Sequence, residues 1–218
     1  MKAFIIGIAG GTGRRIARLL VDRGWDVDGL VRGDEQLRSL AGDGIEARIG
    51  DFTRMSVDEL AVALRGCEII VFSAGAGGKG GEEATTAIDG EGPGRIASAA
   101  NLAGVARFYL ISAFPEAWRG RHMAASFEHY LLEKKRAEAD LVRRDLDWVV
   151  VRPSALFDDP GTGEVDLGPA KIHGRITRDD VAATIVALIA EPSIKRVILE
   201  VTAGTTSITS AVAELVRR

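Results

Sequence analysis

Tyr130 and Lys134 are the residues of this sequence whose types and spacing are best suited to chemistry. They lie four positions apart in a segment that we expect to be helical, so they share one face of the helix. A lysine ammonium stabilises a neighbouring phenolate, and we therefore expect Lys134 to lower the pKa of Tyr130 toward working pH. Such a phenol can give its proton to a carbonyl oxygen as the carbonyl is reduced. The alternative is that Tyr130 only packs its ring on a sheet.

A glycine-rich turn near the N-terminus indicates where a redox partner would bind. An apolar run over residues 3–8 leads into a turn with spaced glycines at positions 7, 10 and 13, and an amphipathic helical pattern covers residues 12–23. Such glycines permit a tight turn, let backbone N–H groups approach a phosphate, and let the helix pack on the strand. The helix N-terminus adds unpaired donors and a partial positive charge. The sequence therefore predicts a dinucleotide pyrophosphate site made by Gly7, Gly10, Gly11, Thr12 and Gly13.

A second glycine-rich segment follows the fourth expected strand. Five glycines occupy positions 75 to 81, directly after Ser73 and Ala74. Glycines allow the backbone to pass close to a ligand. We expect Ser73, Ala74 and Gly75 to lie against the nicotinamide side of the dinucleotide.

Apolar runs and helical patterns alternate along the chain, which is typical of a parallel sheet with helices on both faces. The expected strands span residues 3–8, 26–31, 45–49, 68–73, 106–112, 147–152 and 195–201. The expected helices span residues 12–23, 34–41, 56–65, 86–103, 125–144, 178–190 and 207–217. We predict an α/β, Rossmann-type doubly wound domain over residues 1–218, with a small substrate-covering region around 154–176.

Charge and composition narrow the classes of partner. The net charge is −3, from 28 basic and 31 acidic residues that are well mixed, so no surface for nucleic acid or membrane is indicated. The N-terminal apolar run is too short for a signal peptide, and no segment approaches the roughly 20 apolar residues of a membrane span. Cys67 is the single cysteine, and a small buried thiol is the expected role. We expect a cytoplasmic protein.

The sequence resembles the atypical short-chain dehydrogenase/reductases, in particular the small members with one NAD(P)-binding domain. These include proteins similar to biliverdin and flavin reductases and to bacterial sugar epimerase-like proteins. The order and spacing of short fragments over nearly the whole chain carry the resemblance. The fragments lie at residues 7–13, 30–32, 50–51, 72–75, 104–108, 111–112, 130–134, 151–153 and 176–181.

The resemblance implies roles for four further positions. Ser112 would orient the substrate oxygen and complete a Ser/Tyr/Lys set, in which Lys134 also holds the nicotinamide ribose. Asp51 would accept a hydrogen bond from the adenine amino group, although an Asp after a glycine is also an ordinary turn residue. Arg152 and Pro153 match the motif that ends the sixth strand and directs the chain over the nicotinamide. In the flavin-reductase-like relatives solvent can supply the proton, and the tyrosine is often absent or unused.

The end of the second strand bears on the choice of cofactor. An acidic residue there favours the ribose 2′-OH of NAD, whereas a basic residue accepts the 2′-phosphate of NADP. Arg32 occupies this position, and Arg14 follows the third glycine, so two guanidiniums can share the phosphate. Asp28 would compete as an NAD-type carboxylate but comes too early on the strand. We predict NADP (NADPH); the alternative is that both arginines are solvated surface residues.

The substrate region is expected to form from residues 113–126 and 154–175, which leave strand ends at the ligand edge. Side chains of the first segment could clamp an aromatic or anionic compound, or belong to an exposed loop with unrelated charges: Trp118, Arg119, Arg121 and His122. Residues 154–218 leave room only for a small ligand. We assign the Arg178-Asp179-Asp180 run to a structural helix start.

No metal is expected, because the histidines at 122, 129 and 173 lack the spacing of metal ligands. We predict an NADP(H)-dependent oxidoreductase that transfers hydride to a small carbonyl, quinone or flavin-like acceptor. The alternative is a non-enzymatic NADP(H)-binding sensor or regulator whose dinucleotide shifts affinity for a protein partner. An NAD(P)-dependent epimerase or dehydratase is a weaker alternative. The exposed faces of the helices near 86–103 and 125–144 are candidates for pairing two subunits into a homodimer.

Overall fold

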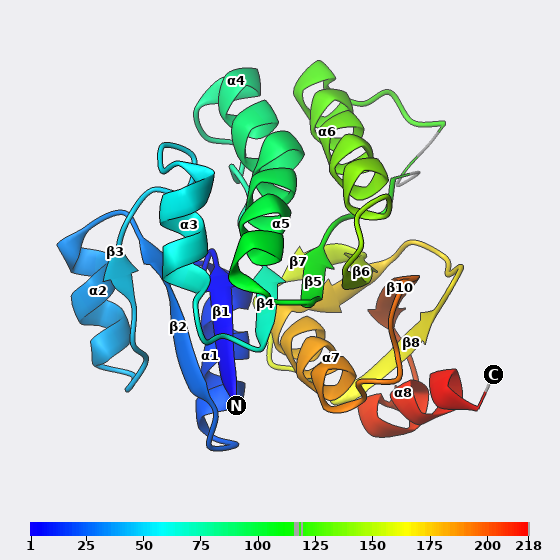
Figure 1. The fold of residues 1–218 in the computed structure, drawn as a ribbon. Coiled ribbons are helices and arrows are strands. Elements are labelled where there is room, and N and C mark those ends of the chain that lie inside the picture. Colours follow the sequence, from blue (N-terminus) through cyan, green and yellow to red (C-terminus); the bar gives the residue numbers. More distant parts are fainter. Residues whose placement is uncertain (116–117, 119, 218) are drawn as a thin grey trace.

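A computed structural model describes residues 1–115, 118 and 120–217 of the chain. Helices flank a central nine-stranded sheet on both faces, which confirms the expected Rossmann-type α/β architecture (Figure 1). The strands are β1 (Lys2–Ile6), β2 (Asp26–Val31), β3 (Arg48–Ile49), β4 (Ile69–Phe72), β5 (Arg107–Ile111), β6 (Asp147–Pro153), β7 (Ala155–Phe157), β8 (Glu164–Gly168), β9 (Arg175–Thr177), β10 (Val197–Ala203) and β11 (Thr206–Ser207). The helices are α1 (Gly11–Val21), α2 (Asp34–Ala41), α3 (Val57–Leu64), α4 (Gly81–Thr85), the π-helix η1 (Thr86–Glu91), α5 (Gly92–Ala103), α6 (Ala125–Leu141), α7 (Arg178–Ala190) and α8 (Ile208–Val216).

The strand order places a ligand crevice between β1 and β4. The sheet runs β11-β8-β10-β6-β5-β4-β1-β2-β3, and all its pairings are parallel except those of β8 with β10 and β11. The order in which successive strands are added to the sheet reverses between β1 and β4, because β2 and β3 extend it on one side and β4, β5 and β6 on the other. In such sheets ligands bind beyond the carboxyl ends of the strands at this switch point. One glycine-rich segment directly follows β1, and the other directly follows β4.

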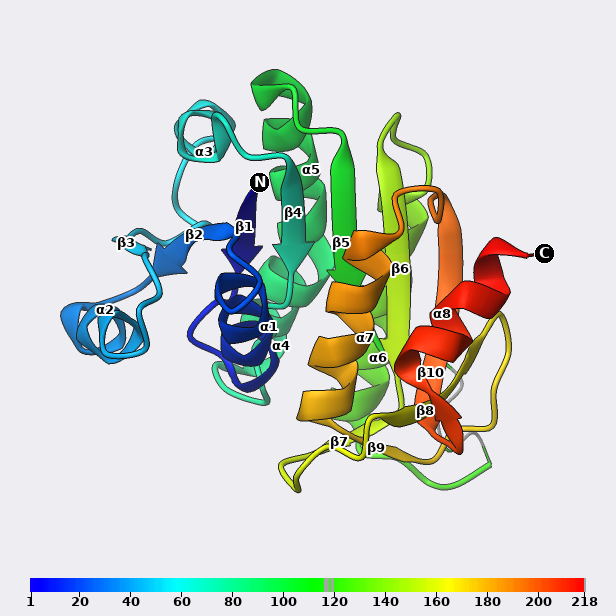
Figure 2. The same cartoon turned by 90° about the horizontal axis from the view of Figure 1, so that it is seen from below.

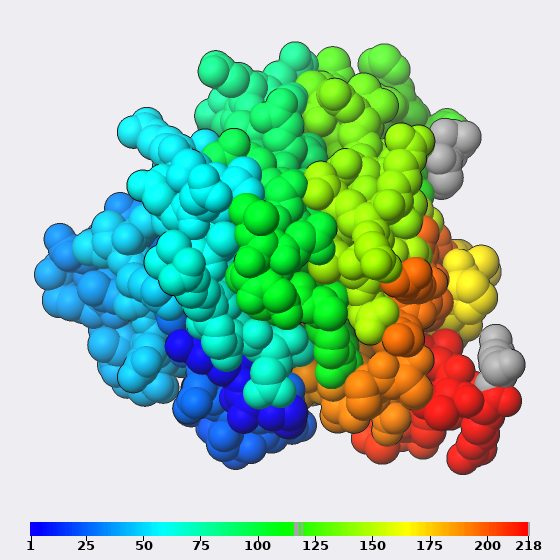
Figure 3. Space-filling view, viewed as in Figure 1, coloured from blue at the N-terminus to red at the C-terminus, as the bar shows by residue number. Residues whose placement is uncertain are grey.

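Two apolar cores hold the helices to the sheet. Helices α1, α7 and α8 cover one face, and α3, α5 and α6 cover the other (Figure 2). Successive side chains of a strand point to opposite faces, so Ile5 packs in the first core while Phe4 and Ile6 pack in the second. The space-filling view shows α5 and α6 side by side on the second face (Figure 3). Burial on both faces explains why the central strands are continuous apolar runs.

Local sequence signals set several element ends. Ser56 and Glu59 form a reciprocal capping box at the start of α3, as a Ser three residues before a Glu indicates. Gly104 takes a φ of 73° and ends α5, a backbone conformation that glycine adopts without strain. Thr177 accepts a hydrogen bond from the Asp180 N–H at the start of α7.

Two regions differ from the expectation. The helix expected over 86–103 is the last part of a longer helical run, α4, η1 and α5, that begins at Gly81 and contains a π-helix. The region around 154–176, expected to cover the substrate and with no strand predicted in it, contains β7, β8 and most of β9. These strands have three to five residues and pair with distant segments, β7 with β9 and β8 with β10, so no local pattern indicates them.

Candidate active site

The first glycine-rich turn is shaped by contacts that only glycine permits. Gly7 has a φ of 85°, and a Cβ there would lie 2.7 Å from the backbone nitrogen of Ala74. A Cβ on Gly13 would overlap the carbonyl oxygen of Gly7. The first glycine therefore lets the two glycine-rich segments touch, and the third lets α1 pack on the turn.

The start of α1 offers backbone donors to a ligand. The N–H of Gly10 donates to the Gly7 carbonyl at 2.9 Å, and the N–H of Arg14 donates to the Gly10 carbonyl at 2.9 Å. The N–H groups of residues 11–13 belong to the first turn of a helix, which has no partner for them within the helix. A cavity of about 560 Å³ lies beside them. Its walls include Gly7, Gly10, Gly11, Thr12, Arg32, Asp51, Ser73, Ala74 and Gly75 from the predicted set.

The two arginines predicted to share a phosphate are placed differently. Arg32 lines this cavity, and its backbone N–H donates to Gln36 Oε1 at 2.9 Å. The guanidinium of Arg14 is held on α2 and the turn after it, by Asp43 at 2.5 Å and by the Ser39 hydroxyl and carbonyl at 2.9 Å. Arg14 lines neither of the two cavities described here. Its expected place beside Arg32 is thus corrected, because carboxylate and hydroxyl partners hold it elsewhere.

Asp28 lies in the buried core, whereas Asp51 lies at the cavity. Asp28 is buried and pairs with Arg48 and with Lys2, the latter at 3.5 Å. Asp51 lines the cavity and forms a turn through Oδ1, which accepts from the Thr53 N–H at 3.0 Å and hydroxyl at 2.7 Å. The turn role of Asp51 is confirmed. The adenine contact stays a prediction.

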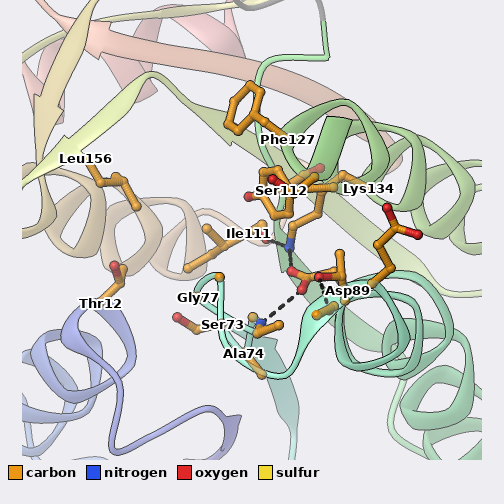
Figure 4. Close-up of a pocket in the computed structure, with 18 residues that line it drawn as sticks. Thr12, Ser73, Ala74, Gly77, Asp89, Ile111, Ser112, Phe127, Lys134 and Leu156 are labelled. Atoms are coloured by element: carbon orange, nitrogen blue, oxygen red, sulfur yellow. Dashed lines mark hydrogen bonds and ion pairs between the residues drawn. The ribbon is translucent and has the colours of Figure 1, made fainter. Parts of the chain in front are cut away.

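A second cavity of about 430 Å³ adjoins the first and holds the predicted chemical residues. Thr12, Ser73, Ala74, Gly75, Ala76 and Leu156 line both cavities. Ser112, Tyr130 and Lys134 line the second, as does Phe127. In Figure 4, Thr12 and Leu156 lie across this cavity from Ser112, Phe127 and Lys134. The fold thus brings the Ser/Tyr/Lys set together at the carboxyl edge of the sheet.

Lys134 is held by a buried carboxylate that the sequence analysis did not identify. Its Nζ lies 3.0 Å from Oδ1 of Asp89, with the two side chains 4% and 1% exposed. Oδ2 of Asp89 accepts from the Ala76 N–H at 2.9 Å, and Lys134 Nζ donates to the Ile111 carbonyl at 3.4 Å (Figure 4). Burial alone would lower the pKa of Lys134, but nearby negative groups outweigh burial and raise this pKa. Lys134 is therefore a charged ammonium in a largely apolar wall.

Lys134 acts on the pKa of Tyr130 in the expected direction, but the net shift of that pKa is upward and not downward. Burial raises the pKa of Tyr130 and outweighs the opposite effect of Lys134, while Asp89 adds to the increase. The ammonium lies 5.7 Å from the centroid of the Tyr130 ring. Tyr130 is therefore a phenol over the whole neutral range, because an acid whose pKa rises keeps its proton to higher pH.

Ser112 carries a hydroxyl that no group described in the structure satisfies. The residue directly follows β5 and is 4% exposed, and its backbone N–H donates to the Val151 carbonyl at 2.8 Å. Its Oγ is fully buried and has no hydrogen-bond partner among the described residues. Buried hydroxyls are normally paired, and the unpaired one here lines a cavity. This arrangement is suited to a ligand that brings its own polar atom.

Arg152 and Pro153 are not brought to the cavities. The guanidinium of Arg152 pairs with Glu138 at 2.5 Å and with Glu200 at 3.5 Å. Pro153 ends β6 and pairs in register with Val201 of β10. Neither residue lines the two cavities, so the predicted cofactor contact is corrected to a role in joining α6, β6 and β10.

The expected substrate loop contributes aromatic groups more than charges. The Trp118 ring lies 5.9 Å from Phe127 and 4.9 Å from His173, and Phe127 lies 5.7 Å from Tyr130. Arg121 and His122 are exposed. Arg119 lies outside the described residues. An aromatic series therefore leads from the cavity residue Tyr130 toward the surface.

Sequence reasoning missed three groups at the site. Asp89 sits inside a helical segment with no motif around it, so its partner is visible only in three dimensions. Leu156 reaches both cavities from β7, a strand that was not predicted. Arg178 lines the first cavity, with its Cδ 2.9 Å from where a Cβ of Gly11 would stand, although its run was assigned a structural role.

The rest of the run has that structural role. Oδ1 of Asp180 accepts from the Gly163 N–H at 2.8 Å, and the Asp179 carboxylate pairs with Arg15 at 2.5 Å. Among the residues that the structure describes, no group of three or more His, Cys, Asp or Glu side chains is arranged to hold a metal. Within the same residues, every helix is too short or too polar to cross a membrane.

Comparison with known proteins agrees with this geometry. Residues 7–192 match the model of the family described as NAD(P)H-binding. The chain belongs to the NAD(P)H-binding family. It is also 34% identical over 216 residues to the "Uncharacterized sugar epimerase YhfK" of Bacillus subtilis (strain 168), covering 99% of this chain and 100% of that protein.

Solved structures share the fold over nearly its whole length. The oxidoreductase ylbE from Lactococcus lactis superposes with a TM-score of 0.87 at 26% identity, covering 100% of this chain and 98% of that one. ChuY, an anaerobillin reductase from Escherichia coli O157:H7, superposes with a TM-score of 0.79 at 24% identity, covering 93% and 97%. Together with the family match, these likenesses confirm the resemblance to the atypical short-chain dehydrogenase/reductases.

Proposed function

We propose that this protein is an NADPH-dependent reductase that delivers hydride and a proton to a small carbonyl compound. The observation that carries the proposal is the unpaired, buried Ser112 hydroxyl beside Tyr130 and Lys134, in a cavity that adjoins the dinucleotide cavity. A buried hydroxyl without a partner loses free energy, roughly 1–3 kcal/mol, unless a ligand satisfies it. A carbonyl oxygen supplies the missing acceptor.

The residues present fit a dinucleotide. Gly7 and Gly13 let the backbone of the glycine-rich turn pack closely, and the start of α1 presents backbone donors suited to a pyrophosphate. The described cavities join along Thr12, Ser73 and Ala74, so one extended molecule can occupy both. A bound dihydronicotinamide supplies the hydride of the reaction.

The side chains of the second cavity perform the proton chemistry. Ser112 donates a hydrogen bond to the carbonyl oxygen of the acceptor and fixes its orientation. Tyr130 donates its phenolic proton to the same oxygen as the carbonyl carbon accepts hydride, so one C–H and one O–H bond form and the C=O double bond becomes single. Solvent then returns a proton to the phenolate. The raised pKa of Tyr130 suits this direction, because the residue starts each cycle protonated.

The preference for NADPH over NADH rests on Arg32. Arg32 lines the first cavity and directly follows β2, where its guanidinium would meet a 2′-phosphate. The nearby carboxylate that would favour NAD, Asp28, is buried in ion pairs with Arg48 and Lys2. Binding of NADPH and NADH should therefore differ mainly through one side chain.

The aromatic series Tyr130, Phe127 and Trp118 supports a second class of acceptor, a planar quinone or flavin-like ring. Such a ring would lie against Phe127 and take hydride while solvent supplies the proton. Tyr130 would then contribute contact area and no proton. The two classes are separated by the dependence on the Tyr130 hydroxyl.

The test is anaerobic oxidation of NADPH by the purified protein with aldehydes, ketones, quinones and flavins as acceptors. We expect turnover of carbonyl compounds that collapses in Tyr130→Phe and falls about tenfold or more in Ser112→Ala. Turnover that survives in Tyr130→Phe, with quinones or flavins only, would establish the second class. Tight NADPH binding by calorimetry with no turnover of any acceptor would overturn the reductase proposal and favour a sensor.

A further inference from the structure

Asp89 is a buried carboxylate that the proposed proton chemistry does not use directly. It lies in η1, and its residue is fully buried. Its Oδ1 makes an ion pair but has no hydrogen-bond partner among the described residues, whereas its Oδ2 accepts a hydrogen bond. Oδ1 faces the Lys134 ammonium at 3.0 Å, and Oδ2 accepts from the Ala76 N–H at 2.9 Å. One side chain therefore connects the helix that carries Tyr130 with the glycine-rich segment that lines both cavities.

The surroundings of Asp89 are built to admit it. A Cβ on Gly75 would stand 3.0 Å from its Oδ1, so the glycine leaves the carboxylate room beside the loop. Removing charged groups from water is costly unless they are paired and hydrogen-bonded. A fully buried acid beside a cavity, paired with another cavity residue, indicates a role at that cavity.

We propose that Asp89 is a positioning residue which, acting through Lys134, keeps Tyr130 in the phenol form that donates a proton. The inference rests on the proposed reductase function. The Asp89 carboxylate balances the Lys134 ammonium and turns it toward η1 and the Ile111 carbonyl, so the positive charge is less available to stabilise a Tyr130 phenolate. A site with an unbalanced lysine would instead favour the phenolate, which suits removal of a proton from an alcohol.

The charged groups around the pair agree with this division of roles. Lys134 is influenced by Tyr130, Asp89 and Glu138, and Tyr130 by Lys134 and Asp89. Asp89 raises the pKa of both Tyr130 and Lys134, and burial raises that of Tyr130 further. Glu82 of α4 also lines the cavity but is exposed.

The composition of the chain permits a direct test that needs no substrate. The sequence has two tyrosines, Tyr109 and Tyr130, and burial raises the pKa of Tyr109 to about 12. Phenolate absorption in the near ultraviolet can therefore be titrated in the wild type and in Asp89→Asn, with Tyr130→Phe to assign the Tyr130 component. We expect Asp89→Asn to move the Tyr130 transition to lower pH by about one unit or more.

The matched control is Glu83→Gln on α4, which also removes one carboxylate but from an exposed position. It should leave the titration unchanged. Circular dichroism over the same pH range shows whether each variant stays folded, and binding of 2′,5′-ADP reports the dinucleotide cavity separately. A titration of Asp89→Asn identical to that of the wild type, in protein that is folded and binds 2′,5′-ADP, would overturn the inference.

Turnover then distinguishes positioning from general support of the structure. We expect Asp89→Asn alone to lower kcat for carbonyl reduction about tenfold, but to lower it less than about twofold further in the Lys134→Met background. Equal losses in both backgrounds would show that Asp89 does not act through Lys134. If no acceptor is reduced at all, the proposed function fails while the shifted titration still stands.

Discussion

The two adjoining cavities are built in different ways. Backbone dominates the dinucleotide cavity: glycines shape it, the first turn of α1 supplies donors, and the charged side chains around it are exposed or paired elsewhere. Side chains dominate the second cavity, where a buried ion pair and an unpaired hydroxyl lie among apolar groups. Binding is therefore spread over many backbone atoms, whereas the proposed chemistry depends on a few side chains whose charges are set by burial.

The largest expected effect is on the chemistry. Tyr130→Phe removes the proton donor and should lower kcat for carbonyl reduction by about 10²–10⁴-fold. The dissociation constant of NADPH should change less than twofold, because Tyr130→Phe keeps the ring that lines the second cavity and removes only its hydroxyl. Steady-state kinetics and calorimetry on the same preparation measure both. A parallel loss of binding and turnover would show that the two cavities do not act separately.

Arg32→Ala should give the next largest effect, confined to the first cavity. Loss of one charged hydrogen-bond donor costs about 1.5–3 kcal/mol, so the dissociation constant of NADPH should rise about 10- to 150-fold. NADH, which lacks the 2′-phosphate, should be little affected. Arg14→Ala is the matched control, because Asp43 and Ser39 hold this arginine. A larger loss from Arg14→Ala than from Arg32→Ala would mean that the Arg14 side chain rearranges to meet the cofactor.

Gly13→Ala tests how tightly the backbone of the first cavity is built. The added methyl group would overlap the Gly7 carbonyl, and forcing atoms into a packed site costs about 1–3 kcal/mol. We expect a lower melting temperature and weaker NADPH binding. Gly24→Ala is not a fair control because Gly24 has a φ of 77°, so Gly33→Ala, which meets open space, serves instead. Equal stability of Gly13→Ala and Gly33→Ala would contradict the packing described for α1.

The smallest effect concerns the ion pairs that Asp43 makes with Arg14 and Arg18. Hydrogen bonds from Arg18 and Arg14 lower the pKa of Asp43 to about 2. Because the pKa is lower in the folded state, this contribution to stability is present above the unfolded value of about 4 and is lost as pH falls toward 2. Urea unfolding at several acidic pH values should therefore show a slightly shallower loss in Asp43→Asn than in the wild type. An identical pH dependence would show that the pairs contribute nothing measurable, as exposed pairs often do.

The success of the sequence-based predictions also differs between features built from backbone and features built from side chains. The dinucleotide turn depends on local spacing, and Gly7, Gly10, Gly11, Thr12 and Gly13 are placed as that spacing predicts. The expected positions of Ser112, Tyr130 and Lys134 in one cavity also followed from strand order. The direction of the Tyr130 pKa could not be predicted, because it depends on burial and on Asp89, which lies 45 residues before Lys134 and has no motif around it.

Side chains with long reach were the least predictable from the sequence. Arg14 and Arg152 were expected at the cofactor, but carboxylates at Asp43, Glu138 and Glu200 hold them elsewhere. A guanidinium on a flexible stem takes whichever carboxylate the fold brings near, and that choice depends on tertiary contacts. The short strands β7, β8 and β9 were missed for a related reason, since they form only by pairing with distant partners.

Transfer of hydride beside the Ser112, Tyr130 and Lys134 cluster is the central claim, and isotopic labelling tests it most directly. NADPH that carries deuterium at C4 is mixed with the protein and a reactive ketone in a single turnover, and the alcohol product is analysed by mass spectrometry. We expect deuterium on the new C–H bond and a rate slower than with unlabelled NADPH, and in Tyr130→Phe we expect the labelled product to form about 10²–10⁴-fold more slowly. Tight binding of labelled NADPH, with no deuterium in the alcohol formed from any ketone or aldehyde, would contradict the proposed hydride transfer.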